Sequence, residues 1–170
     1  MKRIFFSLML LLCVGSVFGQ NADELIKRWK ARSGMSYHNL TKKLKRDRKE
    51  NPDVATWIIT KGQVVRGLVS EIGCQQLQKD LDALEGFKCI YHEKHNSNDE
   101  GPVNDDFKLF HNIQYYAIED GDNITDLVVR IDADTNDGND ITLIRLQGMI
   151  KQEDVTKIIG IKETKTTTFK

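Results

Sequence analysis

The sequence has no net charge, few cysteines and serines, and few long apolar runs, and these shortages exclude several classes of protein. Its 170 residues include 25 Lys or Arg and 25 Asp or Glu. This balance argues against a dedicated nucleic-acid binder, which needs an excess of basic side chains. Beyond residue 19, no stretch approaches the roughly 20 apolar residues that span a bilayer, so we expect no transmembrane segment in the mature protein.

The motifs of the common enzyme classes are also missing. Serine occurs at only four positions after residue 19, and none of them lies in a G-x-S-x-G elbow. The three cysteines form no C-x-x-C redox pair, and the sequence has no glycine-rich loop that could hold a phosphate group. We therefore predict neither a catalytic constellation nor a cofactor.

The first 19 residues have the pattern of a secretory signal peptide. Two basic residues precede Ile4–Val14, an apolar run of 11 residues that is too short to cross a membrane. Val17 and Gly19 are small enough for a cleavage site that follows residue 19. Leu12 precedes Cys13, where lipoprotein processing needs a small residue. We therefore expect export to the periplasm or the cell exterior, without a lipid anchor.

The remaining residues predict a single α+β domain over 20–162 and a polar tail at 163–170. The expected fold is a mostly antiparallel sheet that ends in a β-meander, with helices packed on one face. Apolar spacing indicates helices within 21–33, 39–51, 75–85 and 153–161 and strands within 35–40, 63–72, 87–93, 110–118, 124–131 and 141–150. The expected core consists of Leu25, Trp29, Leu68, Ile72, Leu77, Leu81, Leu84, Ile90, Val128, Ile144 and Leu146.

The acidic stretch DADTNDGND at 132–140 resembles a calcium loop only in composition. An EF-hand loop needs Gly at its sixth position and Glu at its twelfth, and counting from Asp132 these positions hold Asp137 and Leu143. The segments on either side have strand sequences instead of helical ones. The Asp-Gly pair at 137–138 suits a hairpin turn, so we predict a turn and no calcium site.

Two histidines and two cysteines are further candidates. His92 and His95 lie three residues apart, whereas a zincin helix needs a spacing of four, so they predict polar loop residues or, as the alternative, a weak metal site. Cys74 and Cys89 could pair in an oxidising compartment, and a disulfide there would stabilise by up to roughly 3 kcal/mol. A helix and a strand of the expected lengths would place the Cα atoms of Cys74 and Cys89 near the longest separation that a disulfide can bridge. Two buried free thiols are therefore the alternative.

The charges are unevenly distributed along the chain. Residues 20–50 contain ten basic and four acidic side chains, whereas 93–140 contain three basic and thirteen acidic ones. One interpretation is two solvated surfaces that attract each other, which is the commoner case. The other is a basic patch for an anionic partner, such as lipid head groups or an acidic glycan. That patch would comprise Lys42, Lys43, Lys45, Arg46, Arg48 and Lys49.

The order of the expected elements and two sequence pieces point to a family. The pieces are ITDLVVRI, with Asp126 where Glu is usual, and LIRLQGMIKQEDVTKI, with Gly148 at the glycine. The chain thus resembles a family of small exported Bacteroidetes proteins, the domain of unknown function 4252, or a sister family of the same layout. That resemblance implies no activity and no catalytic residue.

These observations leave two functional hypotheses. The first is a non-catalytic periplasmic or cell-surface binding or accessory module, whose partner is an envelope protein or an anionic surface. The alternative is a metal-dependent hydrolase that uses the loop of His92 and His95.

Overall fold

The computed structural model describes residues 20–52, 57–94, 110–135 and 137–159. The predicted signal peptide at 1–19, the predicted loop at 95–106 with His95, and the predicted tail at 163–170 lie outside the described residues. Within the described part of the chain, no helix is both long enough and apolar enough to span a membrane.

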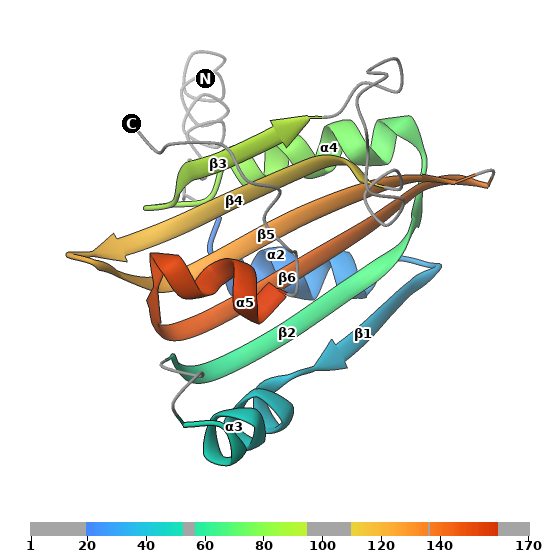
Figure 1. The fold of residues 1–170 in the computed structure, drawn as a ribbon. Helices are drawn as coiled ribbons and strands as arrows, with labels where there is room; N and C mark the ends of the chain where they lie inside the picture. Colours follow the sequence, from blue (N-terminus) through green and yellow to red (C-terminus); the bar gives the residue numbers. More distant parts are fainter. Residues whose placement is uncertain (1–19, 53–56, 95–109, 136, 160–170) are drawn as a thin grey trace, which may run out of the picture.

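The described residues form an antiparallel six-stranded sheet with helices against it (Figure 1). The strand order is β1-β2-β6-β5-β4-β3, so β3 to β6 are consecutive neighbours and form the predicted meander. The α+β class is therefore confirmed. The elements are α2 (Ala22–Lys30), β1 (Met35–Asn39), α3 (Thr41–Glu50), β2 (Ile58–Val69), α4 (Glu71–Asp82), β3 (Lys88–Lys94), β4 (Phe110–Asp120), β5 (Asn123–Thr135), β6 (Gly138–Lys151), the 3₁₀ turn η1 (Gln152–Asp154) and α5 (Val155–Ile159).

Helices α2 and α4 pack on one face of the sheet, as predicted. Trp29 of α2 and Leu77 of α4 are fully buried there against Val128 of β5 and Leu143 of β6. The side chain of Asn21 caps α2 by accepting a hydrogen bond from the backbone N–H of Glu24 at 2.9 Å. The shorter helix α5 lies over the other face (Figure 1). This arrangement sandwiches the central strands between two apolar clusters.

The predicted boundary between β2 and α4 is wrong, and two predicted core residues are wrong with it. The strand ends at Val69, because Ser70 accepts a hydrogen bond from the backbone N–H of Gly73 and caps α4. Ile72 therefore lies in the first turn of a helix and is 78% exposed. Successive side chains of a strand point to opposite faces. Leu68 lies on the less buried face of β2 and is 48% exposed.

The other predicted core residues lie inside the protein. Ile90 and Ile144 are partly buried against the core. The remaining ones are buried: Leu25, Trp29, Leu77, Leu81, Leu84, Val128 and Leu146.

The described residues of the acidic stretch at 132–140 lie at the hairpin ends of β5 and β6. Thr135 pairs with Gly138 in the ladder, and its hydroxyl donates to the Gly138 carbonyl at 2.7 Å. Gly138 has φ +131°, which favours glycine. The predicted turn is therefore confirmed.

Candidate functional site

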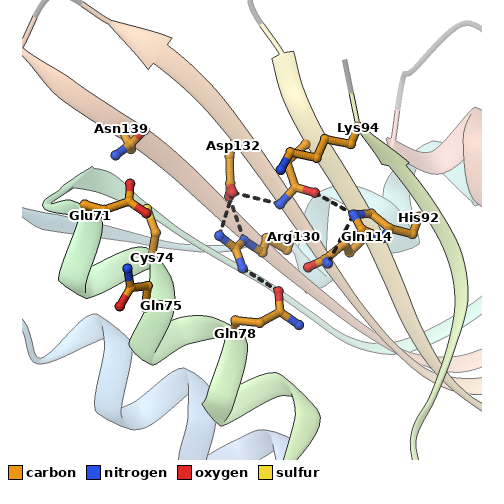
Figure 2. A pocket seen from close by; sticks show the side chains of 11 residues that line it. Glu71, Cys74, Gln75, Gln78, His92, Lys94, Gln114, Arg130, Asp132 and Asn139 are labelled. Carbon is orange, nitrogen blue, oxygen red and sulfur yellow. Dashed lines mark hydrogen bonds and ion pairs between the residues drawn. The ribbon is translucent and has the colours of Figure 1, made fainter. Parts of the chain in front are cut away.

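A polar cavity of about 360 Å³ lies between α4 and the strands β3, β4 and β5 (Figure 2). We call it the polar cavity. Helix α4 contributes one wall, the strands form the floor, and Asn139 of β6 lies at the hairpin end. The lining residues are Glu71, Cys74, Gln75, Gln78, His92, Lys94, Asn112, Gln114, Arg130, Asp132 and Asn139.

The floor consists of two rows of polar side chains that run across three neighbouring strands. Because side chains two apart in a strand point to the same face, each of β3, β4 and β5 contributes two residues to this surface. The strand register then aligns them from strand to strand. One row is His92, Gln114 and Arg130, and the other is Lys94, Asn112 and Asp132.

A buried ion pair holds the centre of the floor. Arg130 donates from Nε to Asp132 Oδ1 at 2.8 Å and from Nη2 to Oδ2 at 2.6 Å. The two residues are only 5% and 2% exposed. Arg130 Nη1 also donates to Gln78 Oε1 on α4 at 2.8 Å, so the pair ties the helix to the sheet. This bidentate geometry fixes both side chains.

The ion pair also sets the orientation of Asn112 and, through it, of His92. Asn112 Nδ2 donates to Asp132 Oδ2 at 2.8 Å, which leaves Asn112 Oδ1 facing His92 Nε2 at 3.0 Å. Since Oδ1 can only accept, His92 Nε2 must carry a proton and donate it. The chain of contacts from Asp132 through Asn112 therefore orients the His92 ring and makes its Nε2 a donor.

Gln114 has no complete set of partners within the described chain. Its Nε2 lies 3.4 Å from His92 Nε2, but that nitrogen cannot donate to Asn112 and accept from Gln114 at once. Its Oε1 is buried and without a partner. Turning the amide over would give His92 a second acceptor and leave Nε2 unpaired instead. A buried amide with an unpaired end costs about 1–3 kcal/mol, and Gln114 is only 5% exposed.

The two cysteines are free thiols in the structure. Cys74 lines the polar cavity from α4, and burial raises the pKa of its thiol. Cys89 is exposed on β3, and its thiol pKa is also raised, mainly by partial burial. Nucleophilic cysteines need a lowered pKa. The arrangement around Cys74 therefore does not favour thiolate chemistry.

The predicted basic patch forms the exposed surface of α3, away from the polar cavity. This helix packs on β2, near one edge of the sheet, whereas the cavity lies at the β3 to β5 end (Figure 1). All six basic side chains are exposed. At 100° per residue, five of them share the side opposite the buried Leu44. This basic face comprises Lys42, Lys43, Lys45, Arg46 and Lys49.

The basic face has few internal partners. Among the described residues, its only ion pair joins Arg46 to Glu50 of the same helix, at 3.8 Å. No acidic side chain from the described part of 93–140 pairs with α3. The predicted attraction between the two charged regions is therefore not seen within the described chain.

The candidate metal residues and the acidic stretch form no metal cluster within the described residues. The described residues contain no group of three or more His, Cys, Asp or Glu that could hold a metal ion. His92 is occupied by Asn112, and His95 lies outside the described residues. Asp132, at the start of the acidic stretch, is bound by Arg130.

The sequence patterns did not predict most residues of the polar cavity. A usable signal exists, because His-x-Lys at 92–94, Asn-x-Gln at 112–114 and Arg-x-Asp at 130–132 each place two polar residues on one face of a strand. Only the strand register brings the three pairs together.

Comparison of the chain with protein-family models, with curated proteins and with solved structures found no match.

Proposed function

We propose that the protein is an exported, non-catalytic binding module that holds an anionic surface through the basic face of α3. The observation that carries this proposal is the exposure of six basic side chains with one internal ion pair among the described residues. The resemblance to small exported proteins supports the export part of the proposal.

The charges on α3 oppose the stability of the helix that carries them. Lys42 and Arg46, and Lys45 and Lys49, are like-charge pairs four residues apart, and each such pair destabilises by about 0.2–0.5 kcal/mol. The first turn holds Lys42 and Lys43 and no acidic residue, although the helix dipole disfavours positive charge there. An external anion would relieve both conflicts.

The partner is better described as a charged surface than as an apolar groove. Leu44 is the only buried residue of α3, and it faces the sheet. The outward side therefore offers charge without an apolar anchor. Phosphate groups of lipids, carboxylates of an acidic glycan or an acidic envelope protein would all satisfy it.

The alternative hydrolase has less support. It needs His92 and His95 as ligands. Within the described chain His92 is held by Asn112 and belongs to no group of three or more His, Cys, Asp or Glu. It remains a prediction that zinc analysis of the purified protein would test.

The binding proposal is tested by reversing charge on the basic face. The variant Lys42→Glu, Arg46→Glu, Lys49→Glu should release the protein from vesicles of anionic phosphatidylglycerol and from heparin beads at low salt. Its Tm should change little, because exposed ion pairs contribute about 0–1 kcal/mol each. Added salt should weaken the wild-type binding, since the attraction is screened.

A matched control variant distinguishes the loss of positive charge on α3 from a change in the net charge of the protein. The variant Lys27→Glu, Lys79→Glu, Lys88→Glu makes the same charge change at exposed positions on α2, α4 and β3. It should retain binding. Equal loss in both variants, or no loss in the first, would show that α3 is not the contact surface. Retention on heparin but not on vesicles would identify a glycan-like partner.

A further inference from the structure

We propose that the polar cavity binds a small uncharged molecule rich in hydroxyl or amide groups, and that the side-chain amide of Gln114 recognises it. This site is separate from the basic face of α3, so the proposal does not depend on the function given above. It follows from the size of the cavity, its charge balance, its amide content and the unpaired end of Gln114.

The cavity has the size and the construction of a ligand site. Its volume of about 360 Å³ lies within the range of roughly 300–1,000 Å³ that is typical of small-molecule pockets. Its floor is rigid, because Asp132 accepts from Arg130 and from Asn112, and Arg130 is tied to Gln78 on the opposite wall. Such a floor keeps its donors and acceptors in place before a ligand arrives.

The charges that line the cavity favour an uncharged ligand. At its centre, Arg130 and Asp132 neutralise each other. An anion drawn to Arg130 would meet the Asp132 carboxylate, and a cation drawn to Asp132 would meet the guanidinium. Glu71 and Lys94 carry opposite charges and lie on opposite sides of this pair (Figure 2). The lining as a whole therefore has no net formal charge.

The remaining lining groups are mostly amides. An amide side chain offers an acceptor oxygen and a donor NH₂, and hydroxyl and amide groups of a ligand likewise donate and accept. Gln75 and Asn139 have no described hydrogen bond from their side chains, so both are available at the cavity. No Phe, Tyr or Trp side chain lines the cavity among the described residues, so binding rests mainly on hydrogen bonds.

A ligand would supply the hydrogen bond that the side chain of Gln114 lacks. Its amide lies in the cavity floor beside His92 (Figure 2), and one of its ends lacks a partner in either orientation. Methionine has nearly the same shape and would remove this unpaired group. An amide at this position is therefore poor for stability alone, and a ligand that pairs with it explains its presence.

The test measures ligand binding and stability on the same variants of the full protein. Glucose, N-acetylglucosamine and inositol serve as uncharged probes, alanine as a zwitterion and inorganic phosphate as an anion. Binding is followed by NMR, through the side-chain amide signals of Asn112 and Gln114. We expect saturable shifts with at least one uncharged probe and none with phosphate or alanine. Gln114→Met should weaken that binding about tenfold or more, while its Tm stays equal or rises.

A second buried glutamine provides the control. Gln63 on β2 is 8% exposed and also has an unpaired Oε1, but it lies outside the cavity lining. Gln63→Met should leave binding unchanged. The proposal is overturned if no uncharged probe gives a saturable shift at about 100 mM, if phosphate or alanine binds in preference, or if both glutamine variants bind as the wild type does.

Discussion

Gly62 and Leu44 approach so closely that a side chain at position 62 would have to displace the end of the Leu44 side chain. A Cβ atom added to Gly62 would lie 2.8 Å from Leu44 Cδ1 and 3.3 Å from Leu40 Cβ. The backbone of Gly62 also accepts from Leu40 N–H at 2.8 Å and donates to the Thr41 hydroxyl at 3.0 Å. The position of the basic face thus depends on a glycine that lies 21 residues beyond the start of α3.

Substitution of Gly62 should therefore loosen α3. Gly62→Ala is expected to destabilise by about 1–3 kcal/mol through overpacking against Leu44, measured by urea unfolding. Leu44→Ala removes the clashing atom but leaves a cavity. The double variant should lose less stability than the two single losses together. Additive losses would show that Leu44 does not oppose a side chain at position 62.

The buried ion pair of the polar cavity predicts an asymmetric mutational pattern. Arg130→Met or Asp132→Leu alone should destabilise by about 3–5 kcal/mol, because each leaves an uncompensated buried charge. The double variant should recover much of this loss, as replacing both partners removes the unpaired charge. Urea unfolding of the three variants measures the effect. If the double variant is no better than the worse single one, the pair is not the source of the loss.

The ion pairs of Asp23 predict how the free energy of unfolding depends on pH in acidic solution. Its side chain forms a hydrogen-bonded ion pair with Lys61 of β2. It also lies 2.7 Å from Arg145 Nη1 of β6, and this second ion pair does not have the geometry of a hydrogen bond. The hydrogen bond from Lys61, helped by Arg145, holds the pKa of Asp23 below its usual value of 3.8. As pH falls below 3.8, the unfolded chain binds the proton first, so stability falls until the folded carboxyl is also protonated.

The matching experiment compares Asp23→Asn with wild type across pH. The variant should be less stable near neutral pH, and the gap should narrow as pH falls through the folded-state pKa of Asp23. Asp122→Asn is the control, since Asp122 is exposed and forms no ion pair within the described residues. A gap that stays constant with pH would show that the ion pairs of Asp23 do not contribute to stability.

The state of the two cysteines predicts how many thiols will react and how fast they will be alkylated. The chain from residue 20 onward contains Cys74 and Cys89, both free in the structure. Thiol titration of denatured protein that begins at residue 20 should therefore give two reactive groups per chain. In the folded protein Cys89 should react before Cys74, because Cys74 is buried. With both pKa values raised, iodoacetamide rates should be low at neutral pH and rise steeply in alkaline solution. A disulfide would leave no reactive thiol before reduction.

Local sequence signals were sufficient for most elements. Asn21 followed by apolar residues at helical spacing predicts α2, and alternating apolar residues predict the strands from 110 to 150. The Asp-Gly pair predicts the hairpin turn, because few residues other than glycine adopt the φ of Gly138. The boundary at Ser70 was missed because apolar β-branched residues on both sides conceal the cap.

The sequence by itself determined the order of the helices and strands, with four consecutive strands before the last helix, and a basic helix with little apolar surface to bury. These features depend on spacing along the chain. The tertiary structure alone decided which face of each strand meets α4. It thereby aligned His92, Asn112 and Asp132 from three strands and left Gln114 without a full set of partners. Contacts between strands depend on register and on which helix covers a face, and neither is encoded in the periodicity of a single segment.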